Sequence, residues 1–316
     1  MKENFIIDGH CDTFYRIYEE GASLYDNRGI LQNSIQNMLK GGVKLQFFAA
    51  WAGDKTQHMS PAVDVNIMIG LFYRQILQNS QIIVPVFCYK DIEQHLNSGK
   101  ILAMLAIEGG EALEGKLEML DIYYRLGVRC LTLTWNNSNE IGHGVLEDDS
   151  GQGLTDFGRK VVKQMNNLGM IIDVSHISKK GFWDVLEAST QPVIASHSNS
   201  SYVHNHKRNL DDDQIKAIAS SGGIVGINFY PRFLGNGRVS VLDILKHIDH
   251  ISLICGNVDC IAFGSDFDGI EQVAEGIENS SHFNNIVEAL YKANYSQADI
   301  KKICNGNYIR YLKRVL

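Results

Sequence analysis

The sequence predicts an α/β protein with a (β/α)8 TIM-type barrel. Eight short apolar runs recur along the 316 residues, each followed by a polar or glycine-containing turn and then an amphipathic stretch. Runs that are apolar throughout are typical of parallel strands buried on both faces. Strands alternating with helices indicate a parallel sheet, and eight strands are the number that closes this kind of barrel.

The predicted strands share a core of β-branched or aliphatic residues. They are Phe5–Gly9, Val43–Ala50, Ile101–Ile107, Cys130–Thr134, Met170–Val174, Pro192–Ser196, Gly223–Asn228 and Cys260–Gly264. A ninth run, Ile82–Phe87, is either an extra strand or a connecting segment.

Amphipathic segments with helix start and stop signals lie between these runs. Helices are predicted over Asn66–Gln78 and Ala112–Leu126, after the capping residues Thr155, Ser178 and Asp211, over Leu242–Ile254, and as two C-terminal helices, the last from near Ser296. Glycines 127, 169 and 222 mark the ends of three of them, as expected at helix C-termini.

Composition limits the classes of partner. The formal charge is −7, and no basic cluster favours nucleic acid or an anionic membrane. The N-terminus lacks the pattern of a signal peptide, and no apolar run is long enough to span a bilayer. Six scattered cysteines indicate reduced thiols and a cytoplasmic protein. With no linker or repeat, residues 1–316 are predicted to form a single hydrolase domain.

Polar residues follow five of the predicted strands. They are His10 and Asp12, Glu108, His176, His197, and Asp266. The carboxyl ends of barrel strands share one face, where catalytic residues of this fold lie, so these side chains are expected to converge.

Each of these residues has a simpler structural interpretation when taken alone. A single histidine at a strand end is usually a hydrogen-bonded structural residue, which is the interpretation for His58, His95, His247, His250 and His282. Cys11 is expected to point away from its neighbours, because side chains alternate along a strand. Three histidines and two carboxylates on one rim, however, are difficult to bury without a cation.

The chemistry of the set indicates a catalytic metal site. Imidazole and carboxylate without thiolate suit zinc or a related divalent ion with an open position. Five ligands exceed one such site, so two ions sharing a carboxylate are the simplest arrangement. Asp266 is then left to accept a proton.

At these residues the chain resembles the renal (membrane) dipeptidase family of the amidohydrolase superfamily. The matching stretches run from residue 8 to residue 269 in the family's order. They are Asp8–Asp12, Glu108–Gly110, Asp173–His176, Ser196–Ser198, Arg208–Asp212 and Gly264–Gly269.

The resemblance implies a role for each matching residue. His10 and Asp12 would bind one zinc ion, His176 and His197 the second, and Glu108 would bridge the two. It further implies that Asp266 is the proton shuttle and that Arg208 holds the substrate carboxylate, with Tyr230 as a weaker candidate for the pocket wall.

One position departs from the animal members of the family. They carry a histidine after the fourth strand that helps to hold the substrate carbonyl, whereas this chain has Trp135 there, as bacterial relatives do. Either His143 takes over that contact or the metal ions alone polarise the carbonyl.

The motifs and the resemblance together imply a zinc dipeptidase that uses a metal-bridging hydroxide, and the cleavage of L-D dipeptides stays open. Two alternatives stay open. One is another amide or ester hydrolase of the superfamily, such as an N-acyl amino acid hydrolase or a lactonase, and the other is a barrel that binds metal without turnover. The expected partner is a small dipeptide, and a homodimer stays open as the assembly.

Overall fold

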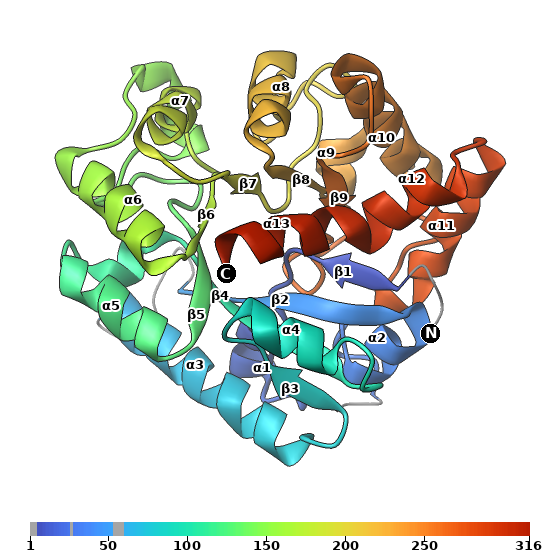
Figure 1. Cartoon of the computed structure of the whole chain (residues 1–316), viewed down its shortest axis with the longest axis horizontal. Helices are drawn as coiled ribbons and strands as arrows, with labels where there is room; N and C mark the ends of the chain where they lie inside the picture. Colours follow the sequence, from blue (N-terminus) through green and yellow to red (C-terminus); the bar gives the residue numbers. More distant parts are fainter. Residues whose placement is uncertain (1–4, 26–27, 53–59) are drawn as a thin grey trace.

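The computed structural model describes residues 5–25, 28–52 and 60–316. Its sheet is parallel throughout, with strands β1 (Ile6–Asp8), β2 (Val43–Trp51), β3 (Ile83–Pro85), β4 (Ile101–Glu108), β5 (Val128–Thr132), β6 (Ile171–Asp173), β7 (Ile194–Ala195), β8 (Ile224–Ile227) and β9 (Ile261–Phe263). The sheet order β2-β1-β9-β8-β7-β6-β5-β4-β3, with a further β2–β4 pairing, closes eight strands into a barrel. The predicted fold is confirmed (Figure 1).

The ninth run is an extra strand outside the closed ring. β3 pairs with the first residues of β4, from Ile101 to Ala103, whereas β5 pairs with β4 from Leu105 onward along the same edge. β2 occupies the opposite edge of β4. β4 therefore has three neighbours, and β3 lies beneath β5 without entering the barrel.

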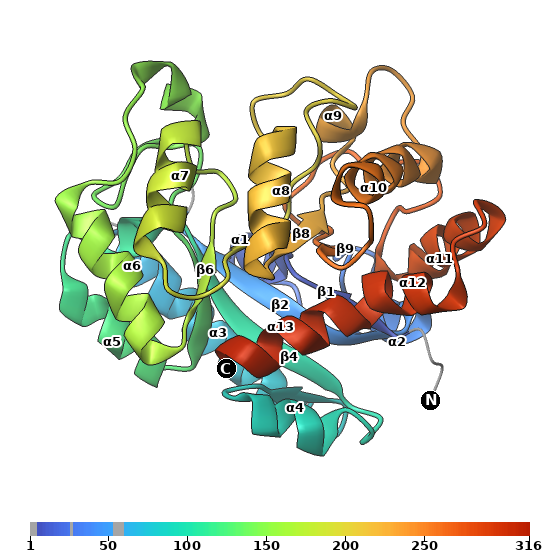
Figure 2. The same cartoon turned by 45° about the horizontal axis from the view of Figure 1, so that its top comes forward.

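The helices surround the barrel (Figures 1 and 2). They are α1 (Thr13–Glu20), α2 (Ile35–Gly41), α3 (Pro61–Gln78), α4 (Tyr89–His95), α5 (Leu117–Arg125), α6 (Asp156–Leu168), α7 (Lys179–Ala188), α8 (Asp212–Ser221), α9 (Pro231–Leu234), α10 (Val241–Cys255), α11 (Phe283–Lys292), α12 (Gln297–Lys301) and α13 (Asn307–Val315). Short 3-10 helices occupy Gly110–Leu113, Val145–Ser150 and Ser280–His282, and a π-helical turn at Lys302–Gly306 joins α12 to α13.

The capping signals of the sequence are borne out. Thr155, Ser178 and Asp211 each accept a backbone N–H from the first turn of α6, α7 and α8, respectively. Gly169 and Gly222 end α6 and α8 in the left-handed conformation that glycine adopts without strain.

The helix predicted over Ala112–Leu126 is wrong in its first half. Glu114 and Gly115 have φ values of 49° and 67°, so a 3-10 turn ends there and α5 begins only at Leu117. Helices α1, α2, α4 and α9 were not predicted, because they are short segments within connections. His58, predicted to be structural, lies outside the described residues.

The barrel interior is closed at the amino ends of its strands. Inward-facing side chains such as Leu45, Leu102 and Ile171 form one buried cluster with Tyr308 and Tyr311 of α13. α13 crosses that end of the barrel (Figures 1 and 2). The carboxyl ends of the strands are therefore left as the open face of the barrel. Among the described residues, no helix combines the length and apolarity needed to cross a membrane.

Candidate metal centre and active site

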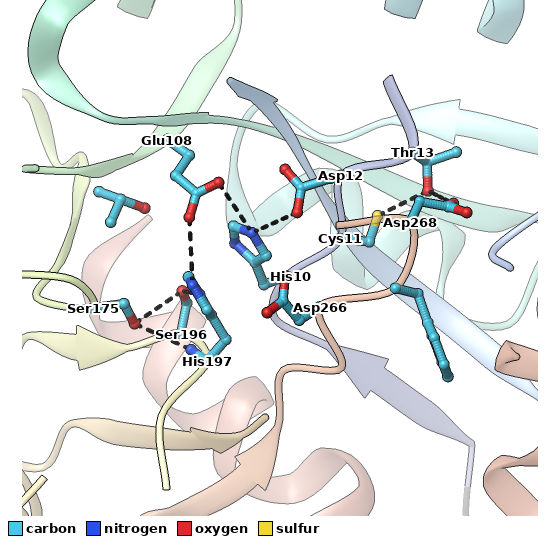
Figure 3. Close-up of polar contacts among 12 residues, drawn as sticks. His10, Cys11, Asp12, Thr13, Glu108, Ser175, Ser196, His197, Asp266 and Asp268 are labelled. Carbon is cyan, nitrogen blue, oxygen red and sulfur yellow. Dashed lines mark hydrogen bonds and ion pairs between the residues drawn. The ribbon is translucent and has the colours of Figure 1, made fainter. Parts of the chain in front are cut away.

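The five predicted ligands lie together at the carboxyl ends of the barrel strands. His10 and Asp12 follow β1, Glu108 is the last residue of β4, and His176 and His197 follow β6 and β7. All five are buried, each with at most 7% of its surface exposed. Figure 3 shows Glu108 facing both His10 and His197, with Asp12 beside His10.

The rings of His176 and His197 present two bare nitrogens to each other. His176 Nδ1 lies 2.8 Å from Asn136 Oδ1, an acceptor, so it carries the proton. Ser196 Oγ donates to Asp173 and therefore accepts from His197 Nδ1 at 2.7 Å. Both Nε2 atoms then hold lone pairs, yet they lie only 2.8 Å apart. Two lone pairs at this distance repel each other, so the pair of rings fits a site in which a cation lies beside both nitrogens.

The pKa values of these two rings agree with neutral imidazoles. Burial, followed by the Arg208 guanidinium, lowers the pKa of His176 to about 3. Burial, and then the neighbouring His10, likewise lower the pKa of His197 well below its usual range. Neutral imidazole is the form that binds a metal ion.

The carboxylate of Glu108 divides its oxygens between two sets of ligands. Oε2 lies 3.5 Å from His10 Nε2, whereas Oε1 lies 3.1 Å from His176 Nε2 and 3.4 Å from His197 Nε2. Burial alone would raise the pKa of Glu108, but His10 and the imidazole contacts lower it well below its usual range. Glu108 is thus an ionised carboxylate between two groups of donor atoms.

His10 and Asp12 form the second group. His10 Nε2 is 3.4 Å from Asp12 Oδ2, which is too long for a good hydrogen bond. Within the described part of the chain, His10 Nε2 and Asp12 Oδ1 are buried without hydrogen-bond partners. Native structures rarely leave such atoms unsatisfied, so these residues fit a divalent ion. Burial lowers the pKa of His10, but the Glu108 and Asp12 carboxylates outweigh it and raise that pKa, an attraction for positive charge that a metal ion would satisfy in place of a proton.

Within the described ranges, donor atoms that lie within 4.8 Å of one another form three overlapping groups. These are Glu108 with His176 and His197, His10 with Asp12 and Asp266, and His10 with Asp173 and His197. Asp173 is already engaged, because its oxygens accept from Ser175 N, Ser196 N, Ser196 Oγ and Thr132 Oγ1. Asp173 therefore positions the loops that carry the two histidines.

Asp8 plays the equivalent positioning part on the other side of the barrel. It ends β1 and accepts hydrogen bonds from the backbone N–H and the hydroxyl of Ser265 at 2.8 and 2.6 Å. Ser265 precedes Asp266, so these hydrogen bonds to Asp8 hold the loop that carries Asp266. Neither Asp8 nor Asp173 was assigned a role from sequence, although each is a carboxylate that ends an apolar strand just before a histidine.

Asp266 lies beside His10 and Asp12 in an unusual backbone conformation. Its φ of 65°, like the 69° of His176, is in the left-handed region that few residues other than glycine adopt. Its Oδ2 accepts a hydrogen bond of 2.8 Å from Asn228 Nδ2. Removal from water, and then the Asp12 carboxylate, raises the pKa of Asp266 to about 8.

A cleft of about 620 Å³ opens above these residues. It contains Asp12, Glu108, His176 and Asp266 and is bounded by Tyr15, Arg16, Gln32, Trp51, Trp135, Asn136, Tyr230, Phe233, Asp268, Gly269, Ile270 and Glu271. Tyr230 lines this cleft as expected, and its hydroxyl donates to Glu271 at 2.8 Å.

Arg208 is buried beside the cleft, where it lines an adjoining cavity of about 240 Å³ that also touches His176. Its Nη2 donates to His197 O at 3.2 Å, and its Nε has no hydrogen-bond partner among the described residues. A buried guanidinium with a spare N–H is suited to an anionic ligand.

The structure does not bring His143 to the metal ligands. Its Nδ1 lies 3.0 Å from Ser138 Oγ and 3.4 Å from Glu147 Oε2, and it is not among the described residues lining either cavity. Trp135, at the position of the missing histidine, lies in the cleft and stacks on His176 with a centroid distance of 5.8 Å.

Cys11, between His10 and Asp12, does not face the cluster of candidate ligands. It donates its thiol to Phe47 O at 3.4 Å.

Comparison with known proteins identifies the family. The family model described as "Membrane dipeptidase (Peptidase family M19)" matches residues 1–316. The chain belongs to this dipeptidase family. An uncharacterised dipeptidase of Schizosaccharomyces pombe is 30% identical over 307 residues, covering 92% of this chain and 74% of the relative.

Solved structures of dipeptidases are similar over the full chain. A crystal structure described as dipeptidase AC, a metallopeptidase of family M19, has a TM-score of 0.92 and 27% identity, with 99% of each chain covered. A Rhodobacter sphaeroides metallopeptidase, with a phosphinate mimic of L-Ala-D-Ala bound, has a TM-score of 0.91 and 26% identity, again with 99% of each covered. This chain is thus a metal-dependent dipeptidase, a hydrolase of peptide bonds.

Proposed function

We propose that this dipeptidase uses two zinc ions. His10 and Asp12 would hold one ion, His176 and His197 the other, and Glu108 both. The observation that carries the proposal is the division of the Glu108 oxygens, with Oε2 toward His10 and Oε1 toward the other two histidines. Imidazole and carboxylate donors suit zinc in a catalytic site.

The chemistry would be hydrolysis of the peptide bond by an activated water. Bound divalent ions lower the pKa of a water and polarise a carbonyl. The chain's own contribution is Asp266, which lies close enough to His10 and Asp12 to receive the proton of that water. Asn228 holds one Asp266 oxygen at 2.8 Å and leaves the other to transfer the proton to the leaving amine.

Arg208 is proposed to bind the free carboxylate of the dipeptide. Its burial and its unpartnered Nε support this role, because the planar fork of a guanidinium matches a carboxylate. Tyr230 and Phe233 would bound the same end of the substrate. The L-Ala-D-Ala mimic bound by the Rhodobacter sphaeroides relative supports the inclusion of L-D dipeptides.

The chain is proposed to act as one catalytic domain in the cytoplasm. The family model spans residues 1–316, and α13 packs into the same barrel that begins at Ile6. All six cysteines are free thiols, as is usual in a reducing compartment.

The test is a dipeptide library assayed alongside elemental analysis. Protein loaded with zinc should contain two ions per chain and hydrolyse dipeptides, including L-D pairs, faster than matched N-acyl amino acids or lactones. Glu108→Gln should lower both the metal content and the turnover. At most one ion in fully active protein would contradict the two-metal site, and faster cleavage of N-acyl amino acids would assign a different substrate.

A further inference from the structure

Three aromatic side chains form a continuous wall along one side of the cleft. Tyr15 of α1 packs edge-on against Trp51, at the end of β2, with a centroid distance of 4.8 Å and an angle of 67°. Trp51 packs against Trp135 at 4.9 Å and 47°. All three are half-buried and line the cleft, so part of each ring faces it. We call Tyr15, Trp51 and Trp135 the aromatic wall.

The aromatic wall reaches the metal ligands at one end. Trp135 stacks on the His176 ring at 27°, and His176 faces Glu108. A substrate whose scissile carbonyl lies at the ligands would therefore place a neighbouring side chain within reach of these rings.

Arg208 lies on the other half of the barrel. In the ring of strands, the aromatic wall lies at the carboxyl ends of β1, β2 and β5, with Trp51 as the last residue of β2. Arg208 follows β7 and packs on Phe233, beyond β8, at 5.6 Å. A dipeptide held by its carboxylate at Arg208 places its C-terminal residue over β7 and β8. Its N-terminal residue then extends across the ligands toward the aromatic wall.

The carboxylates of the cleft are engaged elsewhere. Asp268 accepts hydrogen bonds from Thr13 Oγ1 and from the backbone N–H of Gln32 and Asn33, and Glu271 accepts one from Tyr230. The remaining described ones, Asp12, Glu108 and Asp266, belong to the ligand cluster. Among the described residues, a positively charged substrate side chain on the wall would thus meet aromatic faces and, outside the ligand cluster, no carboxylate without a hydrogen-bond donor of its own.

We propose that the aromatic wall is the subsite for the side chain of the substrate's N-terminal residue and that it selects large apolar side chains. This inference rests on the proposed function, because Arg208 sets the direction in which the dipeptide lies. Aromatic rings offer a large apolar area with little conformational freedom to lose, so a leucine or phenylalanine side chain gains most from the contact.

The test compares a series X-Ala in which X is Gly, Leu, Phe or Lys, using zinc-loaded enzyme. The wild type should favour Leu and Phe over Gly by about tenfold or more in kcat/KM, as burial of part of such a side chain implies. Trp51→Ala should remove most of this preference, and Trp51→Phe should restore part of it. A reversed series, Ala-X, should be affected equally by Trp51→Ala for every X.

Trp183 of α7 offers a matched control, since it is 37% exposed and packs on Phe182 outside the cleft. Trp183→Ala should leave the ratio of Phe-Ala to Gly-Ala unchanged. The chain has only three tryptophans, so in the Trp183→Phe variant the tryptophan fluorescence, excited selectively over tyrosine, comes from Trp51 and Trp135 alone. In the metal-free variant, Phe-Ala should change this emission at lower concentration than Gly-Ala.

The outcomes separate this inference from the proposed function. If the loaded enzyme cleaves no X-Ala substrate, the dipeptidase assignment fails first. If it cleaves them all but shows no preference for Leu and Phe, prefers Lys, or keeps its preference in Trp51→Ala of normal metal content, the aromatic wall is not the subsite. If Phe-Ala leaves the tryptophan emission of the metal-free Trp183→Phe variant unchanged, the inference is also overturned, and this result does not depend on measuring turnover.

Discussion

The ring nitrogens of the proposed ligands His176 and His197 are oriented by hydrogen bonds with neighbouring side chains. Asn136 accepts from His176 and thereby leaves its Nε2 free, and Ser196 does the same for His197 with Asp173 behind it. Such partners commonly set the tautomer and orientation of a ligating histidine. Candidate ligands could be named from the motifs and the family resemblance, but the contact of Asn136 with His176 could not, because Asn136 comes from a loop after β5.

Asp266→Asn tests the proton shuttle. Asparagine has the same shape but cannot accept the proton, so kcat should fall by about 10² to 10⁴ while both metals stay bound. The measurements are kcat with a dipeptide and elemental analysis of the same sample. The control is Asp259→Asn, because Asp259 is a carboxylate near the amino end of β9, away from the cleft. This variant should have the kcat and the metal content of the wild type.

Two results would contradict this role for Asp266. Loss of a metal ion would make it a ligand, in agreement with its place within 4.8 Å of the donor atoms of His10 and Asp12. Near-normal turnover would assign the proton transfer to another group.

Arg208→Ala tests the carboxylate site. Loss of a charge-assisted pair should lower kcat/KM for a dipeptide by roughly 10² or more, corresponding to a few kcal/mol. A dipeptide amide lacks the carboxylate and should lose much less. Arg16→Ala is the control, since this exposed guanidinium lines the same cleft but pairs with Glu20. Equal losses for acid and amide would show that Arg208 acts only through His197.

The starts of the helices differ in how directly the local sequence specifies them. The caps at Thr155, Ser178 and Asp211 were predicted because each depends on a hydroxyl or carboxylate within its own first turn. The early start assigned to α5 was wrong, because the left-handed conformation at Glu114 is not encoded by a residue that favours it.

Thr155→Ala tests the contribution of one cap. Thr155 Oγ1 accepts from Gly158 N at 3.0 Å and donates to Glu140 O, so it joins α6 to the preceding loop. Removal of this hydroxyl should lower the free energy of unfolding by about 1 kcal/mol, the usual contribution of such a cap. The measurement is the urea midpoint, with Thr155→Ser as the control that keeps the hydroxyl. A midpoint equally low in both variants would exclude the cap as the cause.

His247 should make stability depend on pH. On α10, its Nδ1 accepts from Ser200 N and its Nε2 donates to Leu234 O, so it links three segments as a neutral ring. Burial lowers its pKa from 6.5 to about 4. The unfolded state therefore binds the proton more readily, and this stability is complete above pH 6.5 and is lost as pH falls toward 4.

The size of this effect follows from the shift in the pKa of His247, which corresponds to about 3 kcal/mol between the two limits. Urea unfolding of wild type and His247→Gln at pH 7 and pH 5 would measure it. The variant should lose part of the difference between the two pH values. An identical pH dependence in both proteins would show that other groups are responsible.

The whole molecule is held together by closure of the barrel, and the metal site depends on that closure. Asp8 pairs with Phe263 where β1 meets β9, and α13 packs into the opposite end. The proposed ligands come from β1, β4, β6 and β7, so an ion bound to them would connect strands around the ring.

Metal removal should therefore lower Tm. A ligand that binds only the folded state stabilises it by about 3 to 4 kcal/mol at 100 to 1,000 times its Kd. Thermal unfolding before and after chelation, and after zinc is restored, would measure the change. Glu108→Gln should show a smaller response. An unchanged Tm in protein verified to be metal-free would mean that the ions contribute nothing to folding.

The sequence by itself determined the barrel and most of its strands, and it indicated the histidines and carboxylates at the strand ends as candidate ligands, whereas their individual roles and that of Arg208 came from the family resemblance. The strands and the candidate ligands depend on local information, namely apolar runs, caps and side-chain chemistry at strand ends. Only the tertiary structure decided that β3 lies outside the ring, that Glu108 divides its oxygens, that His143 lies apart, and that Tyr15, Trp51 and Trp135 form one wall. These depend on which atoms face one another across the barrel mouth, and non-local packing sets that geometry.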